Sequence, residues 1–463
     1  MASLASLLSL LLLPVPCASL LRQPQSLPLS ARATSTALTG LAAHPWPLKN
    51  GDILRSGWGS SSAFGPRNLS QATWVFESGI PQDAFYQSPL IDHDQNAIFS
   101  STHRTLYSMA PSGKLNWATT LSQEDRFAGQ LPTPVLYGDA IYMVDGQGCI
   151  VCLSLATGKE RWRNRYAFGS GSDSWSMGID PSSSTLFSVA YPDEASSSGC
   201  FYGGTHFYAN SLADGHEKWR YKLKACACNV MPAVFNGTVI FSDHIGNVYS
   251  LDVATGIERW FQPGNHDTTF TTAAAAIGEN DMIYVPSNRG SHAGVLRAYS
   301  LATGEQRWSQ TFDREANSGP AVYRDQNGKL RVSLGIANNG GFPPLLPVLD
   351  IGAEFVGSVF SFDAETGEQA WEFNPPVWKH QACAGSTLLE QCLPDSFSNP
   401  SVDANGMLYI GWMGGTVFAI NGTSGEEVSQ YSIQSGIQGA PGIGKGMLVA
   451  TSCRRVVGIR GLP

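Results

Sequence analysis

Three amide side chains stand at the same place relative to a proline. Asn229, Asn317 and Gln438 each lie three residues before a proline that opens an apolar stretch. Amides both donate and accept hydrogen bonds, so three of them brought together would form a polar mouth able to bind a ligand or ordered water. Buried amides also satisfy backbone groups at strand ends. The sequence leaves both interpretations open.

Two tryptophans in long loops extend this candidate set. Trp175 and Trp378 lie in stretches rich in polar and small residues. An indole ring can stack on a sugar or on an aromatic cofactor, and it can equally anchor its own loop. We include both residues as candidate binding residues and leave the two roles open.

Metal and nucleophile motifs are weak. The stretch DHDQN, with Asp92, Asp94 and Asn96, resembles part of a calcium loop but lacks the distal glutamate, so we interpret it as a turn. CIVC and CAC have no paired histidines at zinc spacing. No GxSxG or phosphate-loop motif occurs. We therefore assign no catalytic residue and no metal ligand.

These residues are positioned by an internal repeat. The stretch LDVATGIERW ends at Trp260, and related copies end at Trp162, Trp219, Trp308 and Trp371. A shorter copy ends at Trp117, and a degenerate copy without the tryptophan ends at Val428. β-Branched and aromatic residues alternate on both sides of each turn, which predicts strands. The glycine supplies a positive φ, and the tryptophan packs between neighbouring sheets.

Each repeat holds four strands, and repeated four-stranded sheets form a propeller. Seven turn motifs give seven blades. Three strands remain after Val428, and the early strand around Trp74 has no blade of its own. Pairing them removes an open edge. The fold prediction is therefore an all-β, eight-bladed β-propeller of four-stranded antiparallel blades, closed by the N-terminal strand joining the last blade.

The ATGxxxW turns, the small-residue–proline strand starts and the opening HPWPLKNGDILRSGW resemble the PQQ-like repeat family over roughly residues 45–461. That family includes quinoprotein alcohol dehydrogenases and the outer-membrane β-barrel assembly lipoprotein. The resemblance implies a propeller but does not choose between an enzyme and a scaffold. For a dehydrogenase it implies PQQ, Ca²⁺, an Asp base and often adjacent cysteines; this chain has no Cys-Cys pair.

The long insertions all fall in connections of one kind. In a blade with strands A to D, the A–B and C–D turns share one face, and the B–C and D–A connections share the other. The A–B and C–D turns are short, so we place any binding site on the opposite face, near the channel mouth. The insertions on this predicted insertion face are residues 163–175, 191–203, 337–357 and 374–399.

Two functional hypotheses follow. The first is a non-catalytic scaffold that binds a protein or a glycan on the insertion face. The second is a PQQ- and Ca²⁺-dependent oxidoreductase acting on an alcohol or a sugar. The net charge of −8 and the lack of a basic cluster exclude nucleic acid as the expected partner. No apolar stretch is long enough for a membrane span, and we expect a monomer.

The N-terminus predicts export. Residues 1–18 resemble a signal peptide, residues 19–45 a flexible leader or linker, and residues 46–463 the propeller. The leader is rich in Ser, Ala, Leu and Pro and has no acidic residue before Asp52, which also fits plastid import. Secretion, or passage through the secretory pathway, is the expected route, and a plastid is the alternative.

Cysteines and sequons agree with an exported protein. Eight of the nine cysteines remain after the leader, and Cys383 and Cys392 share one loop, so we predict a disulfide between them. A second pair is expected among Cys200, Cys226 and Cys228. The sequons predict glycosylation at three asparagines, two of which also fit turn positions: Asn68, Asn236 and Asn421.

Overall fold

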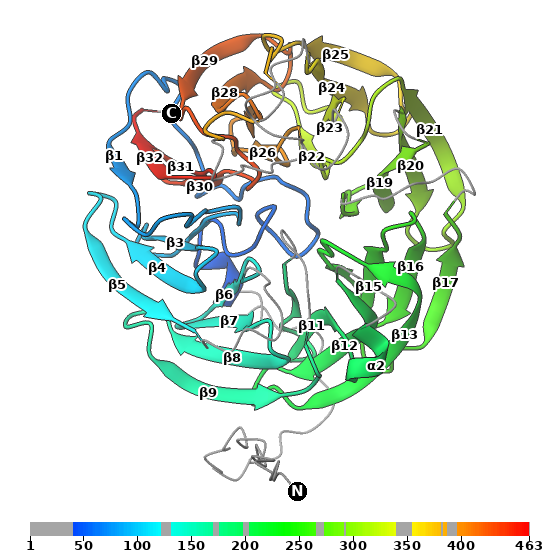
Figure 1. The fold of residues 1–463 in the computed structure, drawn as a ribbon. Helices are drawn as coiled ribbons and strands as arrows, with labels where there is room; N and C mark the ends of the chain where they lie inside the picture. The colour runs from blue at the N-terminus through cyan, green and yellow to red at the C-terminus, as the bar shows by residue number, and fades with distance from the viewer. Residues whose placement is uncertain are drawn as a thin grey trace, which may run out of the picture.

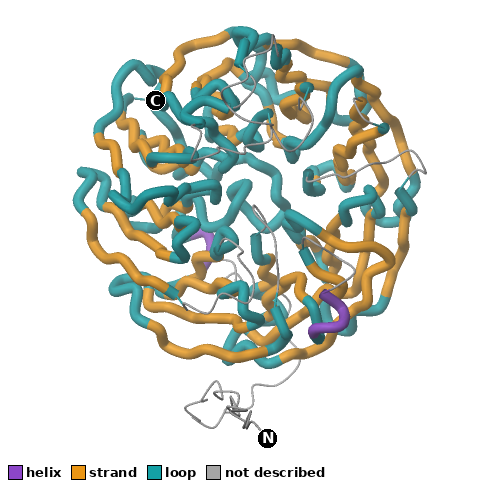
Figure 2. Tube along the Cα trace, in the orientation of Figure 1, coloured by secondary structure: helices purple, strands orange, loops and turns teal. Residues whose placement is uncertain are grey.

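Eight four-stranded antiparallel sheets form a closed ring in the computed structural model (Figure 1). The structure describes residues 40–121, 131–169, 176–197, 203–264, 273–290, 293–338, 354–380, 383–386 and 396–462. The predicted eight-bladed propeller is therefore confirmed. Among the described residues, helix is confined to the short α2 (Glu194–Ser197) and a turn near residue 40, as Figure 2 shows.

The first four blades along the chain follow one another without crossovers. Blade 1 is β2 (Leu90–Ile91), β3 (Ala97–Ser100), β4 (Thr105–Met109) and β5 (Leu115–Thr120). Blade 2 is β6 (Val135–Tyr137), β7 (Ala140–Val144), β8 (Cys149–Ser154) and β9 (Glu160–Arg165). Blade 3 is β10 (Gly178–Asp180), β11 (Thr185–Ala190), β12 (Gly204–Ser211) and β13 (Glu217–Ala227). Blade 4 is β14 (Ala233–Phe235), β15 (Thr238–Ser242), β16 (Val248–Asp252) and β17 (Glu258–Gln262).

Blades 5 to 7 repeat this order, and blade 8 combines the two ends of the chain. Blade 5 is β18 (Ala276–Ile277), β19 (Met282–Arg289), β20 (Ala293–Ser300) and β21 (Gln306–Phe312). Blade 6 is β22 (Ala321–Arg324), β23 (Leu330–Ala337), β24 (Gly357–Asp363) and β25 (Gln369–Phe373). Blade 7 is β26 (Ser401–Val402), β27 (Met407–Gly411), β28 (Thr416–Asn421) and β29 (Glu427–Ser432). Blade 8 is β30 (Gly442–Gly444), β31 (Met447–Thr451), β32 (Val456–Arg460) and the N-terminal β1 (Trp74–Phe76).

A tryptophan–glycine contact joins each blade to the next, except between blades 7 and 8, where Val428 stands in place of the tryptophan. The Trp260 indole of blade 4 packs against Gly304 in the turn of blade 5, and its Nε1 donates to the Leu301 carbonyl at 2.9 Å. Gly304 has a φ of +71°, and a Cβ there would lie 2.7 Å from the indole. Both constraints require glycine. The same pairing recurs at Trp117–Gly158, Trp162–Gly215, Trp219–Gly256, Trp308–Gly367 and Trp371–Gly425.

Trp74 takes this role at the closure of the ring. Its strand β1 pairs with β32, and its ring packs against Gly113 in the turn of blade 1. The Trp74 Nε1, however, has no hydrogen-bond partner among the described residues. The blade 1 turn is one residue shorter: Ala110 bonds to Lys114 and Gly113 as Ser300 bonds to Glu305 and Gly304, so no residue corresponds to Leu301. The shorter turn motif in the sequence thus changes the contact at the closure.

Residues 46–64, the N-terminal strap, cross the middle of the ring (blue in Figure 1) and contact all eight blades, in chain order except for blade 3. Backbone bonds join Trp46 to Ile91 of blade 1, and Phe64 N to Gly444 O of blade 8 at 3.1 Å. Backbone bonds also join the strap to blades 2, 4, 5, 6 and 7: Leu136 N to Pro47 O, Val234 N to Ile53 O, Ile277 N to Leu54 O, Val322 N to Ser56 O and Val402 N to Gly57 O. Blade 3 is reached through Arg55, which donates to Met177 O. The strap is therefore tied to every blade across the middle of the ring.

Arg55 fixes the strap. Its side chain is fully buried and also donates to Pro232 O at 3.0 Å and to Lys49 O at 2.8 Å. Burial lowers the pKa of Arg55 to about 9, which Asp52 partly opposes, so the guanidinium stays charged at neutral pH. Backbone carbonyl oxygens accept the hydrogen bonds that water would accept from an exposed guanidinium, so the charge can be buried.

All connections longer than five residues link strand B to strand C or strand D to the next strand A. The A–B and C–D turns have two to five residues. In an antiparallel blade the two kinds of connection leave opposite ends of the strands. Among the described residues, no helix is long and apolar enough to cross a membrane.

Candidate functional site

Hydrogen bonds join the starts of the innermost strands of blades 6, 7, 8, 1, 2 and 3, and we call this set of strand starts the inner ring. Ala440 N donates to Ser88 Oγ at 2.9 Å, Ser88 N to Thr133 Oγ1 at 3.3 Å, and Thr133 forms a parallel bridge with Ser176. On the other side, Gly319 N donates to Asn399 Oδ1 at 2.7 Å, and Ser401 Oγ donates to the Pro441 carbonyl at 2.6 Å. These small polar residues link neighbouring blades around the channel.

Asn399 connects this ring to the N-terminal strap. Its Nδ2 donates to Asn50 Oδ1 at 3.1 Å and lies 3.8 Å from Met231 Sδ of blade 4. Sequence reasoning missed Asn399, although it stands directly before Pro400 at a strand start, where all of its counterparts but Met231 are small residues. That amide at a small-residue position was the available signal.

The three predicted amides lie near this ring but do not bond to one another. Asn229 is buried, with a φ of +54°, and its Oδ1 lies 3.8 Å from Cys228 Sγ. Asn317 Oδ1 accepts from Asn288 Nδ2 at 2.7 Å. Gln438 is 8% exposed. Asn317 thus has a structural partner, and a shared ligand for the three amides remains a prediction.

Trp378 anchors two connections at the rim. Its backbone pairs with Phe355 through bonds of 2.8 and 3.0 Å, and its ring packs against Gly414 and lies 4.5 Å from the His380 ring. The side chain is half-buried against the blade 6–blade 7 core. This arrangement fits the anchoring role of the two roles considered. Trp175 lies outside the described residues.

The described residues do not present a ligand set for PQQ and Ca²⁺. No group of three His, Cys, Asp or Glu side chains among them is placed to hold a metal. The inner ring is built from amides and hydroxyls rather than carboxylates. Asp92, the calcium-like candidate, accepts from the backbone N of Asp94 at 2.9 Å and of Asn96 at 2.7 Å. It is an Asp turn, as predicted, and we derive no reaction step through a cofactor.

The described residues contain cysteines of both kinds, disulfide-bonded and reduced. Cys226 and Cys453 are each disulfide-bonded, whereas Cys383 is a buried thiol. The predicted Cys383–Cys392 bridge is therefore not confirmed, and Cys392 lies outside the described residues. Cys383 packs in the same buried cluster as Cys453, beneath the segment around Gly436. The loop cysteine thus contributes to packing.

The three sequons remain predicted glycosylation sites. Asn68 and Asn236 are exposed, and Asn421 is half-buried. Asn236 has a φ of +46° in the β14–β15 hairpin, while the side chains of Asn68 and Asn421 accept backbone bonds from Ser70 and Thr423. Each asparagine therefore also performs turn chemistry.

Comparison with known proteins shows the family to which the chain belongs. The profile of the family described as "Outer membrane protein assembly factor BamB" matches residues 103–169, 166–340 and 356–460. The chain belongs to this PQQ-repeat family. A curated relative, outer membrane protein assembly factor BamB from Burkholderia pseudomallei, is 26% identical over 257 residues, 55% of this chain and 58% of the relative.

Other similarities are partial or concern the fold alone. The serine/threonine-protein kinase AfsK of Streptomyces griseus is 30% identical over 156 residues, 33% of this chain and 18% of the kinase. The chain thus spans less than two thirds of either curated relative. The structure of BamB from Moraxella catarrhalis has a TM-score of 0.56 at 15% identity, covering 85% of this chain and 100% of that one. A europium-containing methanol dehydrogenase has a TM-score of 0.62 at 13% identity, covering 90% and 91%.

Proposed function

We propose that this chain is a non-catalytic scaffold that binds a protein on its insertion face. The observation that carries the proposal is membership of a family described as an assembly factor, on a propeller whose long connections all leave one end of the blades. Loops carry binding while a repeated scaffold carries stability. A glycan on the same face is the second candidate ligand within this proposal.

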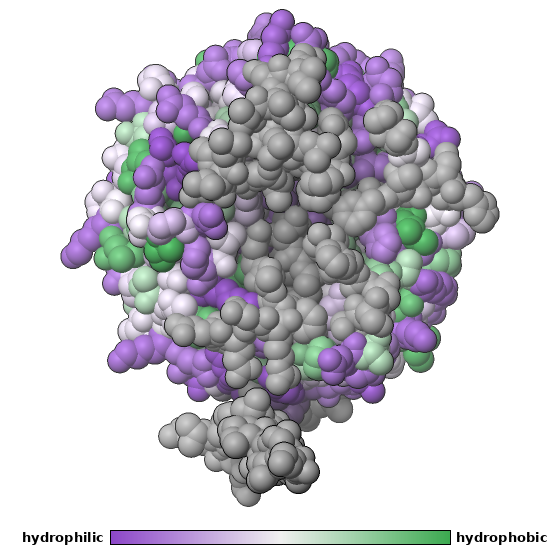
Figure 3. Space-filling view, viewed as in Figure 1, coloured by the Kyte–Doolittle hydropathy of each residue, from purple (hydrophilic) through white to green (hydrophobic). Residues whose placement is uncertain are grey.

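The rim of this face offers adaptable contacts. Glu354 and Lys379 form an ion pair of 3.5 Å and are largely exposed, and Val356 and Val377 beside them are 40% and 41% exposed. Hydrophilic side chains prevail among the described residues in the space-filling view (Figure 3). A mixed polar and apolar rim suits a non-obligate protein interface.

We also propose that the protein acts outside the cytoplasm, as a monomer. Two disulfide-bonded cysteines support an oxidising compartment, since disulfides rarely persist in the cytosol. The secretory pathway is the proposed route, with plastid import as the alternative. A tagged protein observed in the cytosol with fully reduced thiols would contradict this location.

A charge exchange on each face tests the protein-binding proposal. The swap Glu354→Lys with Lys379→Glu keeps an ion pair but alters the insertion rim. The matched swap Glu279→Arg with Arg324→Glu alters a comparably exposed pair at the A–B turns of blades 5 and 6. We expect the first swap to raise the dissociation constant for the native protein partner at least tenfold. The second swap should leave that dissociation constant unchanged. Equal loss in both, or loss only in the second, would contradict the proposed face.

The oxidoreductase alternative rests on the fold shared with methanol dehydrogenase. Calorimetric titration of the full chain with PQQ and Ca²⁺, together with dye-linked oxidation of alcohols and sugars, separates the two functions. The scaffold proposal predicts neither stoichiometric uptake nor turnover. Stoichiometric binding with turnover would replace it with the alternative.

A further inference from the structure

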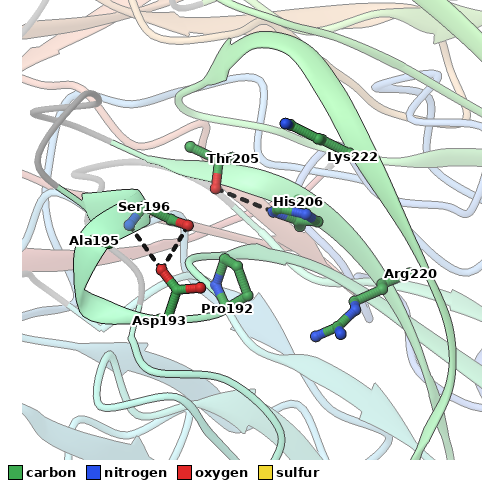
Figure 4. A pocket seen from close by; sticks show the side chains of 8 residues that line it. All are labelled: Pro192, Asp193, Ala195, Ser196, Thr205, His206, Arg220 and Lys222. Atoms are coloured by element: carbon green, nitrogen blue, oxygen red, sulfur yellow. Dashed lines mark hydrogen bonds between the residues drawn. The ribbon is translucent and has the colours of Figure 1, made fainter.

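A solvent-open pocket of about 510 Å³ lies on blade 3. Its walls are the segment around α2 on one side and strands β12 and β13 on the other (Figure 4). The volume falls within the range of small-molecule sites, roughly 300–1,000 Å³. The lining residues are Pro192, Asp193, Ala195, Ser196, Thr205, His206, Arg220 and Lys222.

The strand wall is basic. Arg220 and Lys222 are two residues apart on β13 and therefore share one face of the sheet. His206 of β12 stands directly across from Lys222, and Tyr208 across from Arg220. His206 accepts or donates a 3.1 Å bond to the Thr205 hydroxyl. Three nitrogen-bearing side chains and a hydroxyl thus line one pocket.

Comparison with blade 2 shows what is unusual about the basic residues of blade 3. Blade 2 carries Arg163 and Arg165 at the equivalent strand positions, counted from its tryptophan. There Arg163 pairs with the buried Asp145 and with Glu160 at 2.8 Å, and Arg165 donates to Gln147 O at 2.9 Å. Both blade 2 cations are therefore satisfied within the blade.

In blade 3 the neutralising aspartate is missing. Asp145 opens the tight B–C turn of blade 2, whereas the equivalent connection in blade 3 is the insertion that begins at Tyr191. Arg220 forms a loose ion pair with Glu217 at 3.7 Å and interacts with the Tyr208 hydroxyl, and Lys222 has no ion pair among the described residues. The insertion has replaced an acidic turn with a pocket.

Asp193 does not fill the missing role. Its Oδ1 accepts from Ser196 N at 2.8 Å and from Ser196 Oγ at 2.7 Å, the bonds of a helix cap (Figure 4). No ion pair joins it to Arg220, Lys222 or His206 among the described contacts. The lining therefore keeps an excess of positive charge, on a chain whose net charge is −8.

We propose that this pocket binds a tetrahedral oxyanion, a phosphate or sulfate group, between Arg220, Lys222 and His206. Arg donates in a planar fork and Lys as a point charge, and both geometries serve phosphate and sulfate oxygens. The Thr205 and Ser196 hydroxyls are the remaining polar groups in the lining. The site is independent of the scaffold function, so its failure would leave that proposal untouched.

Calorimetry on the full chain, with inorganic phosphate and with sulfate at constant ionic strength, tests the site. We expect Arg220→Gln and Lys222→Gln each to weaken binding about tenfold. Arg307→Gln on blade 5 removes an equally exposed cation remote from the pocket and should change nothing. Acetate should bind at least tenfold more weakly than sulfate. No binding by the wild type, equal loss in Arg307→Gln, or acetate as tight as sulfate would overturn the proposal.

A substitution that should tighten sulfate binding separates the electrostatic effect from damage to the structure of the pocket. Asp193→Asn keeps a capping side chain but removes the negative charge from the lining, so sulfate should bind about threefold more tightly. Misfolding of the pocket cannot tighten binding. An Asp193→Asn variant with weaker sulfate binding would contradict the electrostatic account.

His206 provides a spectroscopic readout. Burial, and then the charges of Arg220 and Lys222, lower its pKa, which Asp193 partly opposes. Sulfate bound beside the ring should raise that pKa in an NMR titration and should bind more tightly as the pH falls through it. His206→Gln should remove this pH dependence. A His206 pKa that is unchanged by saturating sulfate would place the anion elsewhere.

Discussion

Glycine and tryptophan carry the contact between blades. Each turn glycine combines a positive φ with a position against the preceding blade's indole, so two separate constraints act on one residue. The repeat spacing in the sequence reflects both. This explains why the ATGxxxW pattern persists while the strands around it vary.

Gly304→Ala should separate these constraints. The new Cβ would meet the Trp260 indole at 2.7 Å in a left-handed backbone conformation, and we expect a loss of about 2–4 kcal/mol in unfolding free energy. Gly328→Ala has a similar φ of +76° with nothing within 4 Å, and should cost about 1 kcal/mol. Urea denaturation of the two variants is the measurement. Equal losses would mean that the indole contact adds nothing to the backbone strain.

The N-terminal strap is the element that turns eight blades into one body. It contributes a backbone hydrogen bond or a buried arginine contact to every blade, and its beginning is held by His44. His93 N donates to His44 Nδ1 at 3.1 Å, so His44 Nε2 carries the hydrogen donated to Gly138 O at 3.0 Å. A neutral imidazole is therefore built into this anchor.

This anchor should weaken in mild acid. Burial, and then the charge of His93, lower the pKa of His44 to about 4 from its usual 6.5. The unfolded chain thus binds the proton first, so stability is lost as the pH falls from about 6.5 to about 4. The loss at pH 5 relative to pH 7 is about 2 kcal/mol.

His44→Gln should remove this part of the pH dependence. Urea denaturation of wild type and variant at pH 7 and pH 5 measures it, because other groups contribute equally to both proteins. Hydrogen exchange of the His93 amide should also rise in acid in the wild type. Identical pH dependence in the two proteins would exclude His44 as the titrating anchor.

At the scale of the whole molecule, the sequence predicted the number of blades, their strand order and the closure by Trp74, because turn chemistry and strand alternation are local signals. The strap was not predicted. HPWPLKNGDILRSGW has no strand alternation, and its bonds go to residues up to hundreds of positions away. Asn399 escaped for the same reason: only the closed ring decides which loop residues meet.

The binding face is the central claim, and site-specific photocrosslinking in living cells tests it most directly. A photoreactive residue at Val356 or Val377 samples the insertion face, and one at Phe235 or Ile257 samples the turns at the opposite end, where the side chains are 39% and 67% exposed. We predict a discrete protein adduct from positions 356 and 377 and none from 235 and 257. Adducts formed only from 235 and 257, or from no position at all, would contradict a scaffold that binds its partner through the insertion face.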